Sequence, residues 1–299
     1  MTPERSYLVC ATPRSGSTLV CRALRATRVG GVPEEFFEAL MHSGRPRRPE
    51  EYFLGVDDAS ILDHLGRRGV GEEQQPVSPL WSRTAYDRYL DWALEAGTTA
   101  NGVFGAKLMW GYFGDFISLL RGVPAYQDVP LTDLLPTVFP RLTFVRVLRA
   151  NKLRQAVSLW KAVQTATWRE DSSRDGAPSV EDMPPYQTFL QEHRPQLRFH
   201  YGAISHLLGQ ILRDEAAWDA FFEHLQVRAV LVLYENFATD YETSTRNLLE
   251  RLELPRPLDL DPAPMRPQSN GINDDWVRRY SELRLGTEFD LVPAVPQPS

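Results

Sequence analysis

The chain has 299 residues, of which 42% are apolar and 24% charged, and its net charge is −6. This composition is enough to bury a substantial core, and the acidic balance argues against a general nucleic-acid binder. There is no apolar run of transmembrane length and no signal peptide, so we expect a cytoplasmic protein with no transmembrane segment. Cys10 and Cys21 fit small core residues in a reducing compartment. The six histidines have no zinc-like spacing, so no metal is expected.

The first predicted unit, residues 6–28, consists of an apolar strand, a tight loop and a helix. A helix N-terminus presents unpaired backbone N–H groups and the positive end of its dipole. Glycine lets a phosphate approach the backbone, hydroxyls add donors, and arginine offers a planar fork of donors. The loop therefore predicts a phosphate site formed by Arg14, Ser15, Gly16, Ser17, Thr18 and Leu19.

The sequence of this loop does not match three well-known motifs at a strand-to-helix turn. The nucleoside-triphosphate loop needs a lysine after its last glycine, and none follows Gly16. The nucleophile elbow needs a serine between two glycines, whereas Ser15 and Ser17 flank one glycine. A single glycine also makes no dinucleotide fingerprint. The remaining alternatives are a phosphate-like ligand bound without a metal, or an ordinary strand-to-helix turn.

The next 110 residues carry two features of chemical interest. A short segment at 32–37 places Glu34 and Glu35 before two phenylalanines. A short strand at 102–110 holds Lys107 between apolar residues, which is unusual unless its ammonium reaches an anion or a carboxylate. Lys107 is therefore either a second cation of the site or half of a structural salt bridge. Residues 41–80 fit a surface insertion with a helix near Ile61, and a helix is expected over residues 86–95.

A second strand–helix unit follows, with a strand at 142–148 and a helix at 152–163. Arg149 and Ser158 can both face one anion there, although a solvated loop charge and a packing residue explain them as well. Further along we expect an inserted loop at 167–186, a helix over 199–225 broken near Asp214, and a strand at 227–234. The remaining predictions are a helix at 239–252, extended chain at 255–267, a helix at 274–283 and a disordered tail at 292–299.

The repeated order of strand, helix and strand predicts an α/β fold with a central parallel sheet flanked by helices, in one domain spanning 1–299. Ligands of such sheets bind at the carboxyl ends of the strands. The Arg14 loop and the Arg149 loop both emerge at this edge.

Two phosphate sites on two strand–helix turns resemble the layout of the PAPS-dependent sulfotransferase superfamily, where PAPS is 3′-phosphoadenosine-5′-phosphosulfate. The resemblance is closer to its bacterial trehalose sulfotransferase branch. Matching islands run from residue 7 to about 280, and their combination is more specific than any one of them. They are Pro13–Leu19, Pro33–Phe37, Gly105–Trp110, Gln155–Trp160, Ala162–Thr165, Trp168–Arg169 and Asp274–Trp276.

The resemblance implies a role for each candidate. Arg14 to Leu19 would hold the 5′-phosphosulfate of PAPS, and Arg149 with Ser158 the 3′-phosphate. Glu35 would be the general base, with Glu34 as its competitor. For Lys107, a second cation and a structural salt bridge both stay open. Asn151 departs from the branch, where an acidic residue is expected. No metal would be required.

The resemblance also implies a homodimer and a carbohydrate acceptor. The acceptor would be a hydroxyl of a trehalose-like sugar, or of a sugar on a glycolipid or glycosylated natural product. Segments 41–80 and 111–137 are expected to shape its pocket. Two other functions stay open at this point. They are a small-molecule kinase with a degenerate phosphate loop and a non-catalytic nucleotide-binding protein.

Overall fold

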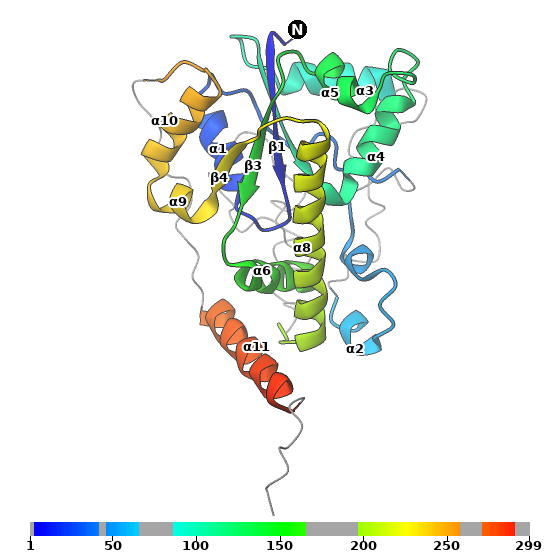
Figure 1. Ribbon diagram of the computed structural model, residues 1–299, viewed down its shortest axis with the longest axis vertical. Helices are drawn as coiled ribbons and strands as arrows, with labels where there is room; N and C mark the ends of the chain where they lie inside the picture. The colour runs from blue at the N-terminus through cyan, green and yellow to red at the C-terminus, as the bar shows by residue number, and fades with distance from the viewer. Residues whose placement is uncertain (1–2, 42–45, 66–85, 166–196, 258–270, 291–299) are drawn as a thin grey trace, which may run out of the picture.

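A computed structural model describes residues 3–41, 46–65, 86–165, 197–257 and 271–290 (Figure 1). Four parallel strands form one sheet in the order β2-β1-β3-β4, which confirms the predicted central parallel sheet. The strands are β1 (Arg5–Ala11), β2 (Val103–Met109), β3 (Thr143–Leu148) and β4 (Val230–Leu233). β1 pairs with both β2 and β3, so the phosphate loop that follows it leaves from the middle of the sheet.

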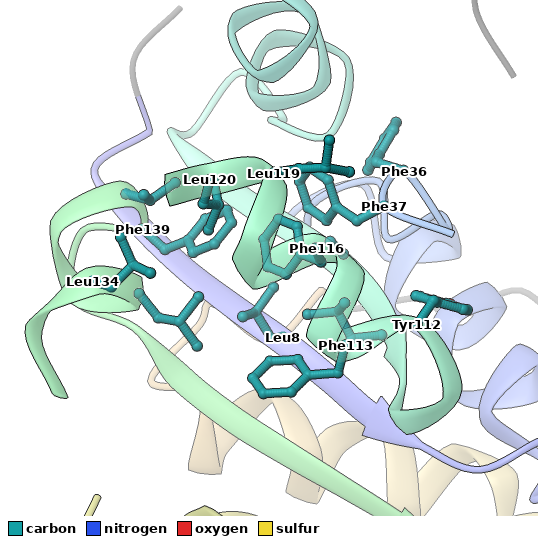
Figure 2. Close-up of a cluster of buried hydrophobic side chains, with 14 of the residues drawn as sticks. Leu8, Phe36, Phe37, Tyr112, Phe113, Phe116, Leu119, Leu120, Leu134 and Phe139 are labelled. Atoms are coloured by element: carbon teal, nitrogen blue, oxygen red, sulfur yellow. The ribbon is translucent and has the colours of Figure 1, made fainter. Parts of the chain in front are cut away.

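Side chains along β1 alternate between the two faces of the sheet. Leu8 and Cys10 pack into one hydrophobic cluster, while Tyr7, Val9 and Ala11 pack into another. On the Val9 side lie α1 (Ser17–Ala26), α9 (Tyr234–Thr239) and α10 (Tyr241–Arg251). The Leu8 side is covered by α3 (Tyr86–Ala96), α4 (Trp110–Arg121) and α5 (Leu131–Val138), which all contribute to the first cluster. Figure 2 shows the aromatic and leucine side chains that α4 places in it, with Leu134 of α5. The sheet is thus a layer between two layers of helices, as predicted.

A third cluster lies beyond the carboxyl ends of the strands. It joins α6 (Lys152–Thr165) and α8 (Tyr201–His224) to η1 (Pro49–Phe53), α2 (Ala59–Leu62) and α11 (Gly271–Asp290). Trp160 at its centre has no exposed surface, and Trp276 of α11 packs at its side. This cluster supports the sheet edge from which the Arg14 and Arg149 loops emerge (Figure 1).

The structure corrects several predicted elements. Helix α8 is continuous through Asp214, because Leu207, Ile211 and Trp218 repeat at helical spacing on its buried face, so the predicted break is wrong. The strand predicted at 227–234 begins three residues later, and Tyr234 already starts α9. Helix α4 was not predicted as an element, since its glycines and aromatic residues favour a strand or a loop.

Both cysteines are buried and unpaired, as expected of core residues. Several predictions fall outside the described residues. They concern the inserted loop at 167–186 with Trp168 and Arg169, the tail at 292–299 and most of the extended segment at 255–267. Of the proposed insertion at 41–80, the structure describes Met41 and residues 46–65, including a helix at Ile61 as expected. The assignment of the whole chain to one domain stays a prediction. No helix among the described residues is long and apolar enough to span a membrane.

Candidate functional site

The loop between β1 and α1 has an unusual backbone. Arg14 has φ 62° and Gly16 has φ 91°, so two left-handed residues flank Ser15. Such turns point successive backbone N–H groups into one concavity, an arrangement that binds anions. A Cβ at Gly16 would lie 2.1 Å from Cδ2 of Tyr234, so only glycine fits both the angle and the space.

The N-terminus of α1 has no internal cap. Its N-cap, Gly16, has no side chain to accept a hydrogen bond from the first turn, and that turn contains no acidic residue. The hydroxyl of Ser15 is buried beside it and has no hydrogen-bond partner among the described residues. Unpaired amides, a helix dipole and a spare hydroxyl together favour a bound anion.

Gln155 of α6 binds the loop through hydrogen bonds of its side-chain amide. Its Nε2 donates to the carbonyl of Pro13 at 2.7 Å and to Oγ1 of Thr12 at 2.9 Å. Thr12 Oγ1 in turn contacts Glu215 of α8 at 3.4 Å, and Nζ of Lys152 donates to the same carboxylate at 2.7 Å. We did not assign Gln155 a role from the sequence, although it stands in one of the matching islands. These buried bonds fix the loop before any ligand arrives.

The loop also contacts residues that follow β3 and β4. The residues concerned are Arg14, Arg149, Ser158 and Tyr234. Nε of Arg14 donates to Oγ of Ser158 at 3.0 Å, and Nη1 of Arg149 donates to the carbonyl of Arg14 at 3.3 Å. The Arg149 guanidinium also lies 5.1 Å from the ring centroid of Tyr234. The structure therefore brings the two predicted sites together as neighbours. Tyr234 was missed from the sequence, where only its place directly after a strand could have drawn attention.

Arg149 sits in an environment that disfavours its charge. Burial lowers the pKa of its guanidinium, although Tyr234 and Glu235 partly offset the effect. Its Nε is buried without a hydrogen-bond partner, and none of the described residues forms an ion pair with it. A half-buried cation with a spare, buried donor is suited to an anionic ligand such as a phosphate.

The N-terminus of α6, in contrast, is capped from within the protein. The Glu235 carboxylate accepts bonds from the backbone N–H groups of Ala150, at 3.0 Å, and Asn151. Although desolvation opposes the shift, these bonds lower the pKa of Glu235. Oδ1 of Asn151 accepts from the N–H of Arg154 at 2.8 Å, which an aspartate could do equally well. Asparagine in place of an acid therefore leaves the cap intact.

Glu35 lies beside Lys107 of β2. Its Oε1 forms an ion pair with Nζ of Lys107, and that ammonium also lies 3.3 Å from Oγ1 of Thr18 in the first turn of α1. Its Oε2 accepts a bond from the Tyr112 hydroxyl at 3.0 Å. Desolvation opposes the charge of Lys107, yet Glu35 and other nearby acidic groups raise its pKa overall, so the ammonium stays charged. Lys107 thus connects the carboxylate to the phosphate loop.

The backbone separates the two candidate carboxylates. Glu34 pairs with Ala106 as an isolated bridge, and its carbonyl accepts from the N–H of Lys107 at 2.9 Å. Its side chain forms a salt bridge at 2.7 Å with the half-exposed Arg25. The Glu35 side chain is 23% exposed and takes the inner position beside Lys107. The Glu35 carboxylate is therefore connected to the loop through Lys107 and Thr18, whereas the Glu34 carboxylate pairs with Arg25.

The geometry offers an anion pocket and a neighbouring carboxylate that can accept a proton. Within the described parts of the chain, no group of three or more potential metal ligands is present. The fold is that of a parallel α/β protein, and the loop at the carboxyl edge of its sheet has a backbone suited to an anion.

A sequence profile of the Stf0 sulphotransferase family matches residues 6–282, so the chain belongs to that family and is an enzyme of the sulfotransferase class. It is 32% identical to a trehalose 2-sulfotransferase of Mycobacterium tuberculosis over 92% of this chain and 94% of the relative. It is 31% identical to a trehalose 2-sulfotransferase of Mycolicibacterium smegmatis, with the same coverage. A solved sulfotransferase from Alicyclobacillus acidocaldarius is 13% identical over 97% of this chain and 96% of that one, with a TM-score of 0.42, too low to carry an argument.

Proposed function

We propose that this protein transfers the sulfuryl group of PAPS to a hydroxyl of a carbohydrate. The observation that carries the proposal is the uncapped N-terminus of α1, with the buried Ser15 hydroxyl on its loop and the spare donors of Arg149 nearby. Two adjoining anion sites suit a ligand with a 5′-phosphosulfate and a 3′-phosphate. The names of the two mycobacterial relatives favour trehalose, or a similar sugar, as the acceptor.

The sulfuryl donor would be held by groups already in place. The amides of Gly16, Ser17 and Thr18 and the hydroxyls of the loop, that of Ser15 included, would bind the 5′-phosphosulfate, whereas the Ser15 N–H already donates to the carbonyl of Thr12 at 3.3 Å. Arg149 and Ser158 would bind the 3′-phosphate, and Arg14, which contacts Ser158 and belongs to the loop, lies between the two. The backbone N–H of Leu19 already donates to the carbonyl of Gly16 at 3.0 Å, so Leu19 would support the loop rather than bind the ligand. Because Gln155 already fixes the loop, little ordering is needed on binding.

The residues would then divide the chemistry between them. Transfer breaks the sulfur–oxygen bond to the phosphate of PAPS and makes a new one to the acceptor oxygen. Glu35 would accept the proton of the acceptor hydroxyl, a form of general base catalysis that contributes about 10²–10⁴-fold. Arg14, Lys107 and the amides at the start of α1 would stabilise the negative charge that develops on the leaving phosphate.

The acceptor would reach Glu35 through the segments expected to shape its pocket. Nη2 of Arg47, from the first segment, donates to the carbonyl of Gly111 in the second at 2.7 Å, next to Tyr112. The Arg47 guanidinium also lies 5.1 Å from the ring centroid of Tyr52. Arginine and aromatic side chains suit a sugar that offers both hydroxyls and apolar faces. A homodimer in the cytoplasm completes the proposal, and sedimentation of the purified protein tests its oligomeric state.

Calorimetric titration with 3′,5′-bisphosphoadenosine, without metal, tests the PAPS site. We expect tight binding that weakens in Arg14→Ala and Arg149→Ala. The matched control is Arg25→Ala, because Arg25 is an α1 arginine paired with Glu34 at the surface. A preference for ATP with magnesium would contradict the proposal and favour the kinase alternative. Binding without sulfation of any sugar would favour an acceptor of another class or the non-catalytic nucleotide-binding alternative.

A further inference from the structure

Glu35 is held by two hydrogen-bond donors that come from one junction of the chain. Lys107 lies on β2, and Tyr112 lies in the first turn of α4, which follows β2 directly. Each contacts a different oxygen: Lys107 contacts Oε1, and the Tyr112 hydroxyl donates to Oε2. A carboxylate held at both oxygens cannot rotate freely, so its plane is set by the junction between β2 and α4.

The Tyr112 hydroxyl can only serve as a donor here. Its side chain is buried, and desolvation, together with the nearby Glu35 and Glu38, raises its pKa well above the ordinary value. The phenol therefore stays protonated and donates to Oε2 of Glu35. Figure 2 shows Tyr112 at the edge of the aromatic cluster, on the same helix as Phe113 and Phe116. Packing of α4 in that cluster fixes where the hydroxyl lies.

We propose that Tyr112 is a positioning residue for the general base. This inference rests on the proposed function, in which Glu35 accepts the proton of the acceptor hydroxyl. By binding Oε2, Tyr112 holds the carboxylate in one orientation and stabilises its charged form, the form that can accept a proton. Tyr112 itself neither gains nor loses a proton in the reaction.

Tyr112→Phe removes the donor and keeps the ring. We expect kcat to fall about tenfold, and the acid limb of the pH profile of kcat/KM to move up by about one pH unit, because the charged carboxylate loses one hydrogen bond. Affinity for 3′,5′-bisphosphoadenosine should stay unchanged. A shift of the acid limb separates positioning of Glu35 from a loss of stability, which changes the amount of active enzyme at all pH values.

Tyr89→Phe is the matched control. Tyr89 is a buried tyrosine of α3, and its hydroxyl donates to the carbonyl of Phe36, so it supports the same 35–37 segment without touching the Glu35 carboxylate. Its pH profile should match the unmodified protein. An unmoved acid limb in Tyr112→Phe, or equal shifts in both variants, would overturn the inference.

Two further measurements keep the test decisive. In a Glu35→Gln background, Tyr112→Phe should cause little additional loss of kcat, whereas an additive loss would assign Tyr112 a role apart from Glu35. If Tyr112→Phe fails to fold, 3-fluorotyrosine at this position keeps the shape and strengthens the donor, so the acid limb should move to lower pH. Full activity of Glu35→Gln alone would instead overturn the assignment of the base in the proposed function.

Discussion

Two helices begin at the same edge of the sheet, and their N-termini differ. Helix α1 starts without any capping side chain, whereas α6 starts with Asn151 as its cap and Glu235 bound to the backbone N–H groups before it. Both ends present the same amides and the same dipole. The carboxylate of Glu235 binds the N–H groups just before α6, whereas the N–H groups at the start of α1 have no capping side chain and are the ones we propose for the ligand.

The difference explains how the two proposed phosphate sites would work. At α1 the backbone itself can bind an anion, so its loop needs glycine and small hydroxyl residues. At α6 the backbone N–H groups of Ala150, Asn151 and Arg154 are already bound by side chains of the protein, and the proposed donors to the ligand are the side chains of Arg149 and Ser158. The first site should therefore depend on backbone geometry, and the second on single side chains.

The largest expected effect concerns the carboxylate linked to α1 through Lys107 and Thr18. Glu35→Gln should lower kcat by about 10²–10⁴-fold, because the amide cannot accept a proton. Binding of 3′,5′-bisphosphoadenosine should persist. Glu34→Gln is the control, since Glu34 pairs with Arg25 at the surface, and it should keep near-normal turnover. Steady-state kinetics of both variants, with sulfated product as the readout, checks this prediction.

Backbone geometry at α1 is tested by Gly16→Ala. The added Cβ meets the Tyr234 ring and also forces alanine into the left-handed region, so we expect a loss of about 2–4 kcal/mol in the free energy of unfolding. Gly55→Ala provides the comparison, because Gly55 has φ 80° with nothing within 4 Å of its Cβ, and it should cost about 1 kcal/mol. Equal losses in denaturant titrations would mean that the contact with Tyr234 is unimportant.

Dependence on a single side chain at α6 is tested by Arg149→Ala. We expect affinity for 3′,5′-bisphosphoadenosine to fall about 10- to 100-fold, as is typical of lost hydrogen bonds to a charged group. Affinity for adenosine 5′-monophosphate, which lacks the second phosphate, should change far less. If calorimetry shows the same loss for both nucleotides, Arg149 does not recognise the 3′-phosphate selectively.

The smallest effect concerns the internal cap of α6. Glu235→Gln should destabilise the protein by at most about 1 kcal/mol at pH 7, because the carboxylate is partly exposed. Its pKa is lowered by folding, so its contribution is complete above its ordinary pKa of 4.5 and disappears as pH falls below that value. Unfolding titrations at pH 7 and pH 3.5 check the sign. Glu242→Gln, in an exposed pair with Arg246 on α10, should show a smaller effect at pH 7.

Local sequence patterns predicted much of the fold and the position of one candidate site. Apolar strands followed by helical periodicity predicted the parallel sheet, and the loop at Arg14–Thr18 predicted an anion site. Helix α4 escaped detection, because its glycines and aromatic residues favour other structures until they are packed into the core. The predicted break at Asp214 was wrong because burial of one face of α8 outweighs a single polar residue.

The sequence by itself determined which turns present backbone donors, since glycine, proline and hydroxyl residues act on their own neighbourhood. Only the tertiary structure decided which side chains meet there. Lys107 reaches Thr18 and Glu35 because β2 pairs with β1 in a register that sets Lys107 beside Val9. Strand order and register depend on how the whole core packs, and no local pattern of residues encodes them.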